Sequence, residues 1–469
     1  MDPSVTQFIS HIAQCFATTS ADNLVTSLPL NHTHPFYRPL YEALGNTSVE
    51  SLDAENISPF LSTIPDDMGD SLASFLSAVL KNIKGSQNTQ DEAERTYDDF
   101  IKLYLVYSEA NRIYGTSSND IYIYSFMTPL ILILAQKILQ LSREAAVLSN
   151  HPPRHPKSSR SIQDATRQVL ERSMQIATSP MTDAEWQAIS RQPYVVGDII
   201  WPLTNILFRI YSLRKLHTQS TELQKVLHNL MPHEEKRFAS RGNLVKAVDV
   251  CQSYYWRGKL GVVLLDMRNA SFWLEKAWTI SPKDEEGWMQ RRSILIRLIP
   301  VNLLLGRIPS PEILETYKLK QFVPLINAFK TGNIPLWRRH LEEQREWLRR
   351  RSIWLILFER GELLVWRNLF RTTLKIFYMT EPTAIKNRCP TWIFVSAAAI
   401  TFTGSGEIED GTITIDDIIV VVASLIDQSL ILGHMSYSHK QLVMKSADDG
   451  FGGFPRISQV VPRRVEAVQ

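Results

Sequence analysis

The sequence is poor in cysteine and has no apolar run of membrane-spanning length. Its 469 residues contain three cysteines, Cys15, Cys251 and Cys389, which lie far apart and have neither metal-ligand nor redox spacing. They predict free thiols in a reducing compartment. The apolar run of residues 126–135 contains a proline and is far shorter than the roughly 20 residues that cross a bilayer, so it predicts a buried helix. The opening residues lack a basic region before an apolar stretch, so neither a secretory signal nor membrane contact is expected.

The chain also has almost no net charge. Its 51 Lys and Arg residues nearly balance 48 Asp and Glu residues, for a formal charge of +3. Such a balance is typical of a solvated surface and does not indicate nucleic-acid binding, so any basic function must be local. With 44% hydrophobic residues, a chain of this length forms a substantial core and has room for two or three domains.

Catalytic and metal-binding motifs are absent from the sequence. Two histidine pairs, 32/34 and 151/155, have no carboxylate or cysteine set at ligand spacing, so surface histidines are predicted and no metal. We expect no cofactor and no enzymatic activity. An α-helical enzyme whose site is assembled from distant residues stays an alternative from another class.

Apolar residues instead recur at helical spacing along most of the chain. One stripe predicts an amphipathic helix that ends at Gly85; its members are Leu72, Phe75, Leu76, Val79, Leu80 and Ile83. Residues 149–161 concentrate proline, serine and basic side chains and predict an exposed loop.

A repeat signature appears in residues 254–282. Small and apolar residues stand there at the spacings of a tetratricopeptide helix pair: Tyr254, Gly258, Ala270, Leu274, Ala277 and Pro282. The small residues let two antiparallel helices approach closely. Because one such unit cannot bury its own apolar face, neighbouring helices must stack on it, which predicts a helical array on both sides.

The next segments continue the pattern of helix pairs. An apolar helix ends at Gly306, and another begins with Ser310 as its cap. In residues 319–337, a helix with one apolar face stops at Gly332, and Asn333 can cap its successor. This hairpin is therefore interpreted as a repeat unit.

The pattern changes near the C-terminus. A helix that is apolar on more than one side comes first. Residues 411–415 then contain β-branched side chains in an alternating pattern, which predicts a short strand. An apolar helix follows over residues 416–427. Two short strands, Gly433 to Tyr437 and Gln441 to Lys445, then form a hairpin. A strand, a helix and a terminal hairpin are typical of a winged helix.

A helical-repeat array followed by a winged helix resembles the PCI domain, which occurs in subunits of the proteasome lid, the signalosome and a translation initiation factor. Four segments carry the closer resemblance: "YYWRGKLGVVLLDMRNASFWLEKAW", "LIPVNLLLGRIPS", "LKQFVPLINAFKTGNI" and "GHMSYSHKQLVMKS". They look like the branch that contains the PCI subunit of the nuclear-pore transcription-and-export complex and a signalosome-associated paralogue. The resemblance covers residues 239–455, and it departs from the branch in an apolar insert at 380–406 and in the residues after Pro455.

The resemblance implies a mostly α fold and a non-enzymatic scaffold. It implies a large PCI-containing partner, a small acidic disordered subunit of the Dss/Sem type, RNA or single-stranded nucleic acid, and nuclear-pore components. The implied process is messenger RNA export at the nuclear-pore periphery, with a signalosome- or splicing-associated paralogue as the alternative. The expected organisation is N-terminal helical repeats at 1–240, PCI repeats at 241–378, a winged helix at 379–455 and a flexible tail at 456–469.

The local basic segment lies at residues 338–351, where six arginines stand against three glutamates. If the segment is helical, Arg338, Arg345 and Arg349 share one face. Phosphate contact is one interpretation; the alternative is a solvated face with ion pairs such as Arg338 with Glu342. Because the candidate groove-reading helix at 415–431 is apolar and acidic, only sequence-tolerant backbone contact is expected. The candidate nucleic-acid residues are Arg338, Arg339, Arg345, Arg349 and Arg350, with His439, Lys440 and Lys445 in the wing.

Two alternatives remain open for these surfaces. The wing could simply pack against a partner protein. Four aromatic residues, Trp354, Trp366, Phe370 and Tyr378, are candidate partner anchors, but at helical spacing a core position is the more common role.

Overall fold

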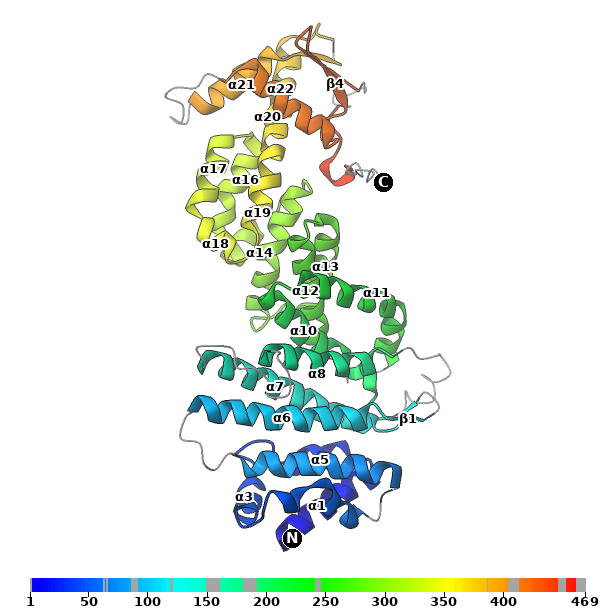
Figure 1. Ribbon diagram of the computed structural model, residues 1–469. Coiled ribbons are helices and arrows are strands. Elements are labelled where there is room, and N and C mark those ends of the chain that lie inside the picture. The colour runs from blue at the N-terminus through cyan, green and yellow to red at the C-terminus, as the bar shows by residue number, and fades with distance from the viewer. Residues whose placement is uncertain are drawn as a thin grey trace. The chain divides into compact units, whose positions relative to one another are not determined.

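The computed structural model is mostly helical and divides into two compact units, Met1–Ser253 and Tyr254–Gln469 (Figure 1). It describes residues 2–61, 64, 66–85, 92–118, 121–148, 161–179, 192–240, 246–385, 387–403, 413–445 and 453–460. The loop predicted at 149–161 lies almost wholly outside these ranges. The boundary between the units falls within α12, whereas the sequence-based boundary was placed at residue 240.

The first unit is built from helices, with one two-stranded ribbon in its described part. Its elements are α1 (Pro3–Ala17), α2 (Ala21–Ser27), α3 (Tyr37–Gly45), η1 (Glu50–Leu52), α4 (Ala54–Ile57), η2 (Ser58–Leu61), α5 (Asp66–Lys84), α6 (Glu92–Tyr114), β1 (Ser117–Ser118), β2 (Ile121–Tyr122), η3 (Ser125–Met127), α7 (Thr128–Leu148), α8 (Ile162–Ala177), η4 (Val196–Ile199), α10 (Ile200–Arg214) and α11 (His217–Ser240). The long helices α5 to α8 are stacked on one another (Figure 1).

Helix α5 confirms the amphipathic stripe read from the sequence. All six predicted apolar side chains are buried, none more than 1% exposed. Gly85 follows the helix with φ +65°, a left-handed conformation that glycine adopts without steric penalty. The spacing of apolar residues and the stop signal together define this helix.

The apolar run at residues 126–135 lies in η3 and the start of α7 and is confirmed as buried helix. Ser125–Leu148 is long and apolar enough to cross a membrane by composition, but 56% of its apolar window is buried inside the unit. Between its neighbours α6 and α8, Tyr107 and Ser173 share a hydrogen bond of 2.8 Å, and Ser173 donates to Asn111 Oδ1 at 2.7 Å. This buried polar network specifies how α6 and α8 pair.

The second unit contains helix pairs followed by a small sheet. Its elements are α12 (Ala247–Val263), α13 (Met267–Ile280), α14 (Trp288–Leu304), α15 (Pro311–Thr316), η5 (Lys320–Phe322), α16 (Val323–Thr331), α17 (Ile334–Glu343), α18 (Arg345–Arg349), α19 (Trp354–Ile356), the π-helical turn η6 (Leu357–Gly361), α20 (Glu362–Thr380), β3 (Arg388–Pro390), α21 (Trp392–Thr403), α22 (Ile415–Asp427), β4 (Gly433–Ser436), β5 (Gln441–Met444) and η7 (Ile457–Gln459).

Small residues bring α12 and α13 into close contact, as the repeat signature predicts. A Cβ placed on Gly258 would lie 2.5 Å from Cγ of Leu274, and one on Gly261 would lie 2.9 Å from the backbone N of Ala270. Leu274 and Ala270 are fully buried. The two helices therefore approach at backbone distance only because these positions carry no larger side chain.

The hairpin of α16 and α17 confirms both of its predicted boundary signals. Gly332 ends α16 in a left-handed conformation, φ +74°. Asn333 caps α17, and its side-chain oxygen accepts a hydrogen bond of 2.9 Å from the backbone N–H of Leu336. Ser310 likewise stands at the N-cap of α15 before Pro311. Local sequence signals thus set the borders of the repeat helices.

The winged helix combines α21 and α22 with an antiparallel sheet in the order β3-β5-β4. The hairpin of β4 and β5 is confirmed, with His434 opposite Val443 and Ser436 opposite Gln441. Helix α22 matches the predicted helix at 416–427 to within one residue at its start. The fold class read from the sequence, a helical-repeat array followed by a winged helix, is therefore confirmed.

The strand predicted at 411–415 is wrong for its described residues. Ile413 and Thr414 are not in a strand. Thr414 caps α22 instead: its hydroxyl accepts a hydrogen bond from the Asp417 backbone N–H at 3.3 Å, and Asp417 in turn accepts one from the Thr414 N–H at 2.9 Å. The third strand is β3, which lies inside the apolar insert and pairs with β5. A capping box prevails here over a short β-branched alternation.

The burial of the three cysteines leads to a testable prediction. Cys15, Cys251 and Cys389 carry thiols rather than disulfides and are no more than 8% exposed, and burial raises the pKa of the Cys15 and Cys389 thiols. Because the thiolate is the reactive form, we expect Ellman's reagent to detect almost no thiol in the folded chain and all three after unfolding in urea. Rapid labelling of the folded chain would contradict this packing.

Candidate nucleic-acid interface

The basic segment at 338–351 forms two short helices rather than one. Helix α17 ends at Glu343, Gln344 leaves the helical conformation with φ −100° and ψ 12°, and α18 begins at Arg345. The inward face is as predicted: Trp337, Leu341 and Leu348 are no more than 3% exposed. Because the segment is not a single helix, the condition for a common helical face of Arg338, Arg345 and Arg349 is not met.

All five arginines of the predicted site are exposed, and several form ion pairs. Arg338 donates to both carboxylate oxygens of Glu362 on α20, through Nε at 3.1 Å and Nη2 at 2.5 Å. Arg345 pairs with Glu342 at 2.8 Å, and Arg350 lies 3.9 Å from Glu346. These three glutamates partly neutralise the segment. Exposed pairs of this kind stabilise a protein by only about 0–1 kcal/mol and can exchange for a phosphate.

An aromatic pair lies beside this arginine segment. Trp354 stacks on Phe358, with ring centroids 4.8 Å apart and planes 13° apart. Arg345 lies over the Trp354 ring at 5.2 Å. Phe358 is 49% exposed, which gives the segment an accessible ring. Sequence reasoning missed Phe358; its spacing of four from Trp354 was the available signal.

The wing residues His439, Lys440 and Lys445 are exposed. The Nδ1 atom of His439 lies 3.0 Å from the hydroxyl oxygen of Ser438 and 3.2 Å from that of Ser436. Lys440 closes the turn with φ +48°. The wing lies beyond α21 and α22, whereas α17 and α18 lie beside α16 (Figure 1). The two predicted basic groups thus stand on different elements of the second unit.

Helix α22, the candidate reader of a DNA groove, confirms its apolar and acidic character. Asp416 and Asp417 are exposed at its first turn, and Val420 is 65% exposed. Carboxylates at this end repel phosphates, so the helix is unsuited to a DNA groove.

Two of the four aromatic candidates form the core of the winged-helix junction. Phe370 is fully buried and packs on Phe394 of α21 at 4.7 Å, and Trp366 is 7% exposed and lies 6.0 Å from Phe402. In this conformation they join α20 to α21, so the core alternative applies to both. Trp354 and Tyr378 are half-buried. Burial, followed by the charge of nearby Cys389, raises the pKa of Tyr378 to about 12.

Exposed apolar side chains occur elsewhere, on α21. Trp392 is 60% exposed and Ile400 is 75% exposed, and they stand on one face of a helix that is apolar all round. The sequence-based analysis noted the apolar insert but did not identify these residues. A helix that is apolar on every side cannot bury all of its apolar side chains within one small domain.

The histidine pair His32 and His34 contacts neighbouring residues of the first unit. His32 packs edge-on against Tyr37 at 4.6 Å, and the His34 Nε2 atom lies 2.9 Å from the carbonyl oxygen of Thr26. Within the residues that the structure describes, no group of three or more His, Cys, Asp or Glu side chains could hold a metal ion. The pair at 151/155 lies outside the described ranges.

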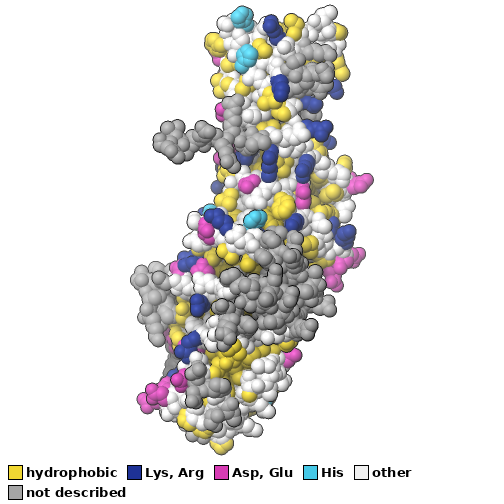
Figure 2. All heavy atoms as spheres, turned by 90° about the vertical axis from the view of Figure 1, so that its right-hand side faces the viewer, with side chains coloured by type: hydrophobic (Ala, Val, Ile, Leu, Met, Phe, Trp, Pro, Cys, Tyr) yellow, Lys and Arg dark blue, Asp and Glu magenta, His cyan; other side chains and the backbone are white. Residues whose placement is uncertain are grey.

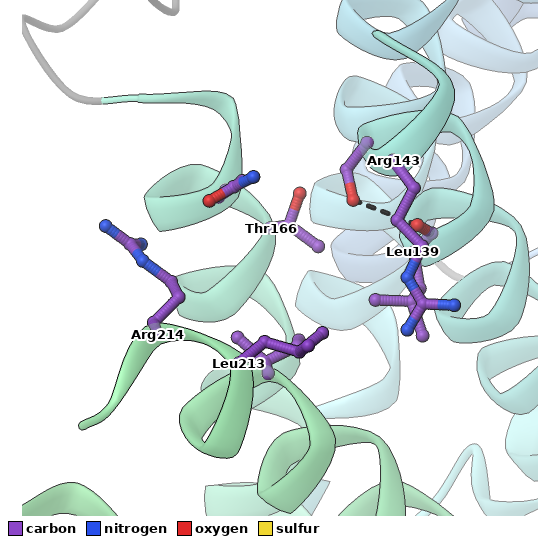
Figure 3. Close-up of a pocket in the computed structure, with 8 residues that line it drawn as sticks. Leu139, Arg143, Thr166, Leu213 and Arg214 are labelled. Atoms are coloured by element: carbon purple, nitrogen blue, oxygen red, sulfur yellow. Dashed lines mark hydrogen bonds between the residues drawn. The ribbon is translucent and has the colours of Figure 1, made fainter. Parts of the chain in front are cut away.

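A small cavity in the first unit lies between α7, α8 and α10 (Figure 3). Leu139, Thr166 and Leu213 line it, and the Ser142 hydroxyl donates to the Leu139 carbonyl at 3.0 Å. Arg214 at its rim pairs with Asp164. Its volume of about 60 Å³ is far below the roughly 300–1,000 Å³ of ligand sites, so it is a packing void.

Helical repeats that continue into a winged helix define the architecture of a PCI-type protein. No family model matches the chain. It is 36% identical over 181 residues to a PCI domain-containing protein of Schizosaccharomyces pombe, covering 38% of this chain and 39% of that protein. It is 27% identical over 259 residues to PCI domain-containing protein 2 of Xenopus laevis, covering 55% and 57%. A Drosophila melanogaster homologue of that protein is 32% identical over 168 residues, covering 36% and 38%.

The chain is thus similar, over part of its length, to PCI domain-containing proteins. The matched regions cover 39%, 57% and 38% of the lengths of these three relatives. The chain therefore matches little more than half of a relative's length at most.

Proposed function

We propose that the chain is a non-catalytic scaffold subunit of a nuclear, transcription-coupled mRNA-export complex at the nuclear-pore periphery. It pairs with a larger PCI protein and a small acidic disordered subunit of the Dss/Sem type. It contributes a sequence-tolerant contact to RNA. The observation that carries the RNA contact is the exposed arginine segment of α17 and α18 beside the rings of Trp354 and Phe358.

The chemistry of this segment suits a single strand better than a duplex. Guanidinium groups bind phosphates in bidentate geometry, and bases stack on accessible rings such as Phe358. Both kinds of contact are independent of base identity. The acidic start of α22 supports the same conclusion, because the helix that would read a duplex carries the wrong charge.

Charge reversal tests the RNA contact. We expect the triple variant Arg338→Glu, Arg345→Glu and Arg349→Glu, in the assembled complex, to bind single-stranded RNA at least tenfold more weakly. If three phosphate contacts are lost, the slope of log K against log salt decreases by about 2. The measurement is fluorescence anisotropy with a labelled oligouridylate across a salt series. Unchanged binding at low salt would eliminate this segment as the contact.

A matched control separates local from general electrostatics. Lys283 and Lys320 are exposed and lie outside the arginine segment, so Lys283→Glu with Lys320→Glu changes the net charge without touching it. We expect this double variant to bind within about twofold of the parent. A comparable loss in both variants would mean that only net charge matters.

The complex itself is tested by purifying the tagged chain from its own cells at moderate salt, followed by mass spectrometry. Recovery of a large PCI protein, a small acidic subunit and nuclear-pore components supports the export role. Recovery of signalosome or splicing proteins instead would assign the alternative paralogue and overturn the export role.

A further inference from the structure

A basic groove in the second unit is lined by none of the residues of the predicted site. Four segments form it: the residues 305–308 that follow α14, the end of α16, the middle of α20 and the segment Gly453–Val460, which we call the C-terminal strap. The groove has a volume of about 400 Å³. On the face shown in Figure 2, lysine and arginine side chains gather over the part of this unit next to the winged helix.

The strap is a fixed wall of the groove. The buried guanidinium of Arg367 donates to the carbonyl oxygen of Leu430 at 3.0 Å and to that of Pro455 at 2.5 Å. Arg268 on α13 donates to the carbonyl oxygen of Val460 at 2.6 Å. Ile457 packs over Gly306, where an added Cβ would lie 3.1 Å from its side chain. The described residues at 456–460, predicted as flexible, are thus held against the repeats.

The charge of the groove is of one sign. Its lining includes no carboxylate among the described residues and contains five cations: Arg307, Lys330, Arg367, Arg371 and Arg456. Arg307 pairs with Glu275 outside the lining at 2.7 Å. Burial, and then the charge of Arg371, lowers the pKa of Arg367 to about 10, so Arg367 stays protonated at neutral pH. Like charges gathered around one hollow repel one another, and an anion bound there relieves the repulsion.

We propose that this groove binds the phosphate backbone of single-stranded RNA, as a second contact beyond the arginine segment. The proposal rests on the RNA contact proposed above. Its cations come from four separate segments of the protein. An RNA strand, which carries one phosphate charge per nucleotide, therefore meets a cation on each side of the groove. Thr372 and Ser458 add hydroxyl groups to the same lining.

The lining favours a phosphate backbone over an acidic peptide. Peptides gain most of their affinity from apolar or aromatic anchors that enter open pockets. The two aromatic residues here, Phe329 and Phe454, are only 3% and 7% exposed and already fill the wall of the groove. Phosphates need cations and hydroxyl donors alone, and guanidinium groups bind them bidentately.

The test compares charge reversals in the groove with the control already described. We expect Lys330→Glu with Arg371→Glu, in the full chain within its complex, to weaken binding of a fluorescent oligouridylate at least fivefold. The salt slope should decrease by about 1.4 if two phosphate contacts are lost. Lys330→Glu with Arg456→Glu, which leaves α20 intact, should give a similar loss. The Lys283 and Lys320 control should bind within about twofold of the parent, and circular dichroism verifies folding of each variant.

The outcomes separate this inference from the proposed function. If the groove variants bind RNA like the parent while the arginine-segment variant loses binding, the groove is not an RNA site and the proposed function stands. If only the groove variants lose binding, the groove is supported and the arginine segment is not. A groove that binds a labelled polyglutamate peptide, with loss in both groove variants and no change in RNA affinity, would overturn the inference in favour of an acidic protein partner.

Discussion

Replacing Gly332 by alanine is expected to destabilise the second unit by about 2–5 kcal/mol. Gly332 has φ +74°, and the left-handed conformation costs an L-residue about 1–2 kcal/mol. A Cβ at this position would also lie 2.5 Å from Cα and 2.6 Å from N of Leu369 on α20. Because the obstacle is backbone, α16 and α20 must separate, and overpacking of this kind costs about 1–3 kcal/mol more. Urea unfolding followed by circular dichroism measures the loss.

Gly306 provides the matched control for this substitution. It has nearly the same backbone conformation, φ +78°, but its nearest neighbour is the side chain of Ile457 at 3.1 Å. A side chain can shift where a backbone cannot, so Gly306→Ala is expected to cost about 1–2 kcal/mol from the conformation alone. Equal losses in the two variants would show that the close approach of α16 and α20 contributes nothing.

Replacing Arg367 by methionine is expected to cost about 2–6 kcal/mol. Arg367 is 4% exposed, and its hydrogen bonds to Leu430 and Pro455 satisfy two carbonyl groups that lie far apart in the sequence. Methionine fills similar space but leaves both carbonyls without this donor, at about 1–3 kcal/mol each. We also expect the C-terminal strap to become sensitive to limited proteolysis, because one of its anchors is lost.

The pH dependence of this effect follows from the lowered pKa of Arg367, about 10 against an ordinary value of 12.5. Between these values the unfolded state binds more protons than the folded state. The contribution of this group to the free energy of unfolding therefore increases as the pH rises, but only above about pH 10. Below that the arginine is charged in both states. The loss in Arg367→Met should therefore be constant between about pH 6 and 9, and a loss that changes steeply in that range would contradict a charged Arg367.

Arg371 is the control for Arg367. It lies one helical turn further on α20 and is exposed. Arg371→Met should cost less than about 1 kcal/mol, because surface substitutions rarely do more. If the two substitutions were equally destabilising, the carbonyl bonds of Arg367 would not explain its effect.

Much of the fold could be predicted from the sequence because its signals act over one or two helical turns. Gly332 and Asn333 end and begin helices through bonds to residues at most five positions away, and Gly85 follows α5 in a left-handed conformation. The apolar spacing in α5 identifies its buried face without reference to any other element. The small residues Gly258 and Ala270 mark a helix pair because close packing excludes larger ones.

The same local rules failed where two signals competed or where a partner was distant. The β-branched residues 413–414 predict a strand. Thr414 instead caps α22, and its hydroxyl accepts a hydrogen bond from the backbone N–H of Asp417. The short strand at 388–390 has too few residues to be recognised and exists only because β5 pairs with it. The basic segment read as one helix, and nothing in its spacing indicates the break at Gln344.

By itself, the sequence determined the helical repeats, their borders, the winged helix and the absence of a local catalytic motif, because caps, glycine stops and apolar periodicity act between near neighbours. Tertiary structure alone decided which charges pair with one another and which line a common groove. Arg338 finds its carboxylate 24 residues away at Glu362, and the basic groove draws its lining from positions between 305 and 458. Electrostatic character is a property of side chains that meet in space, and these meet only after the chain has folded.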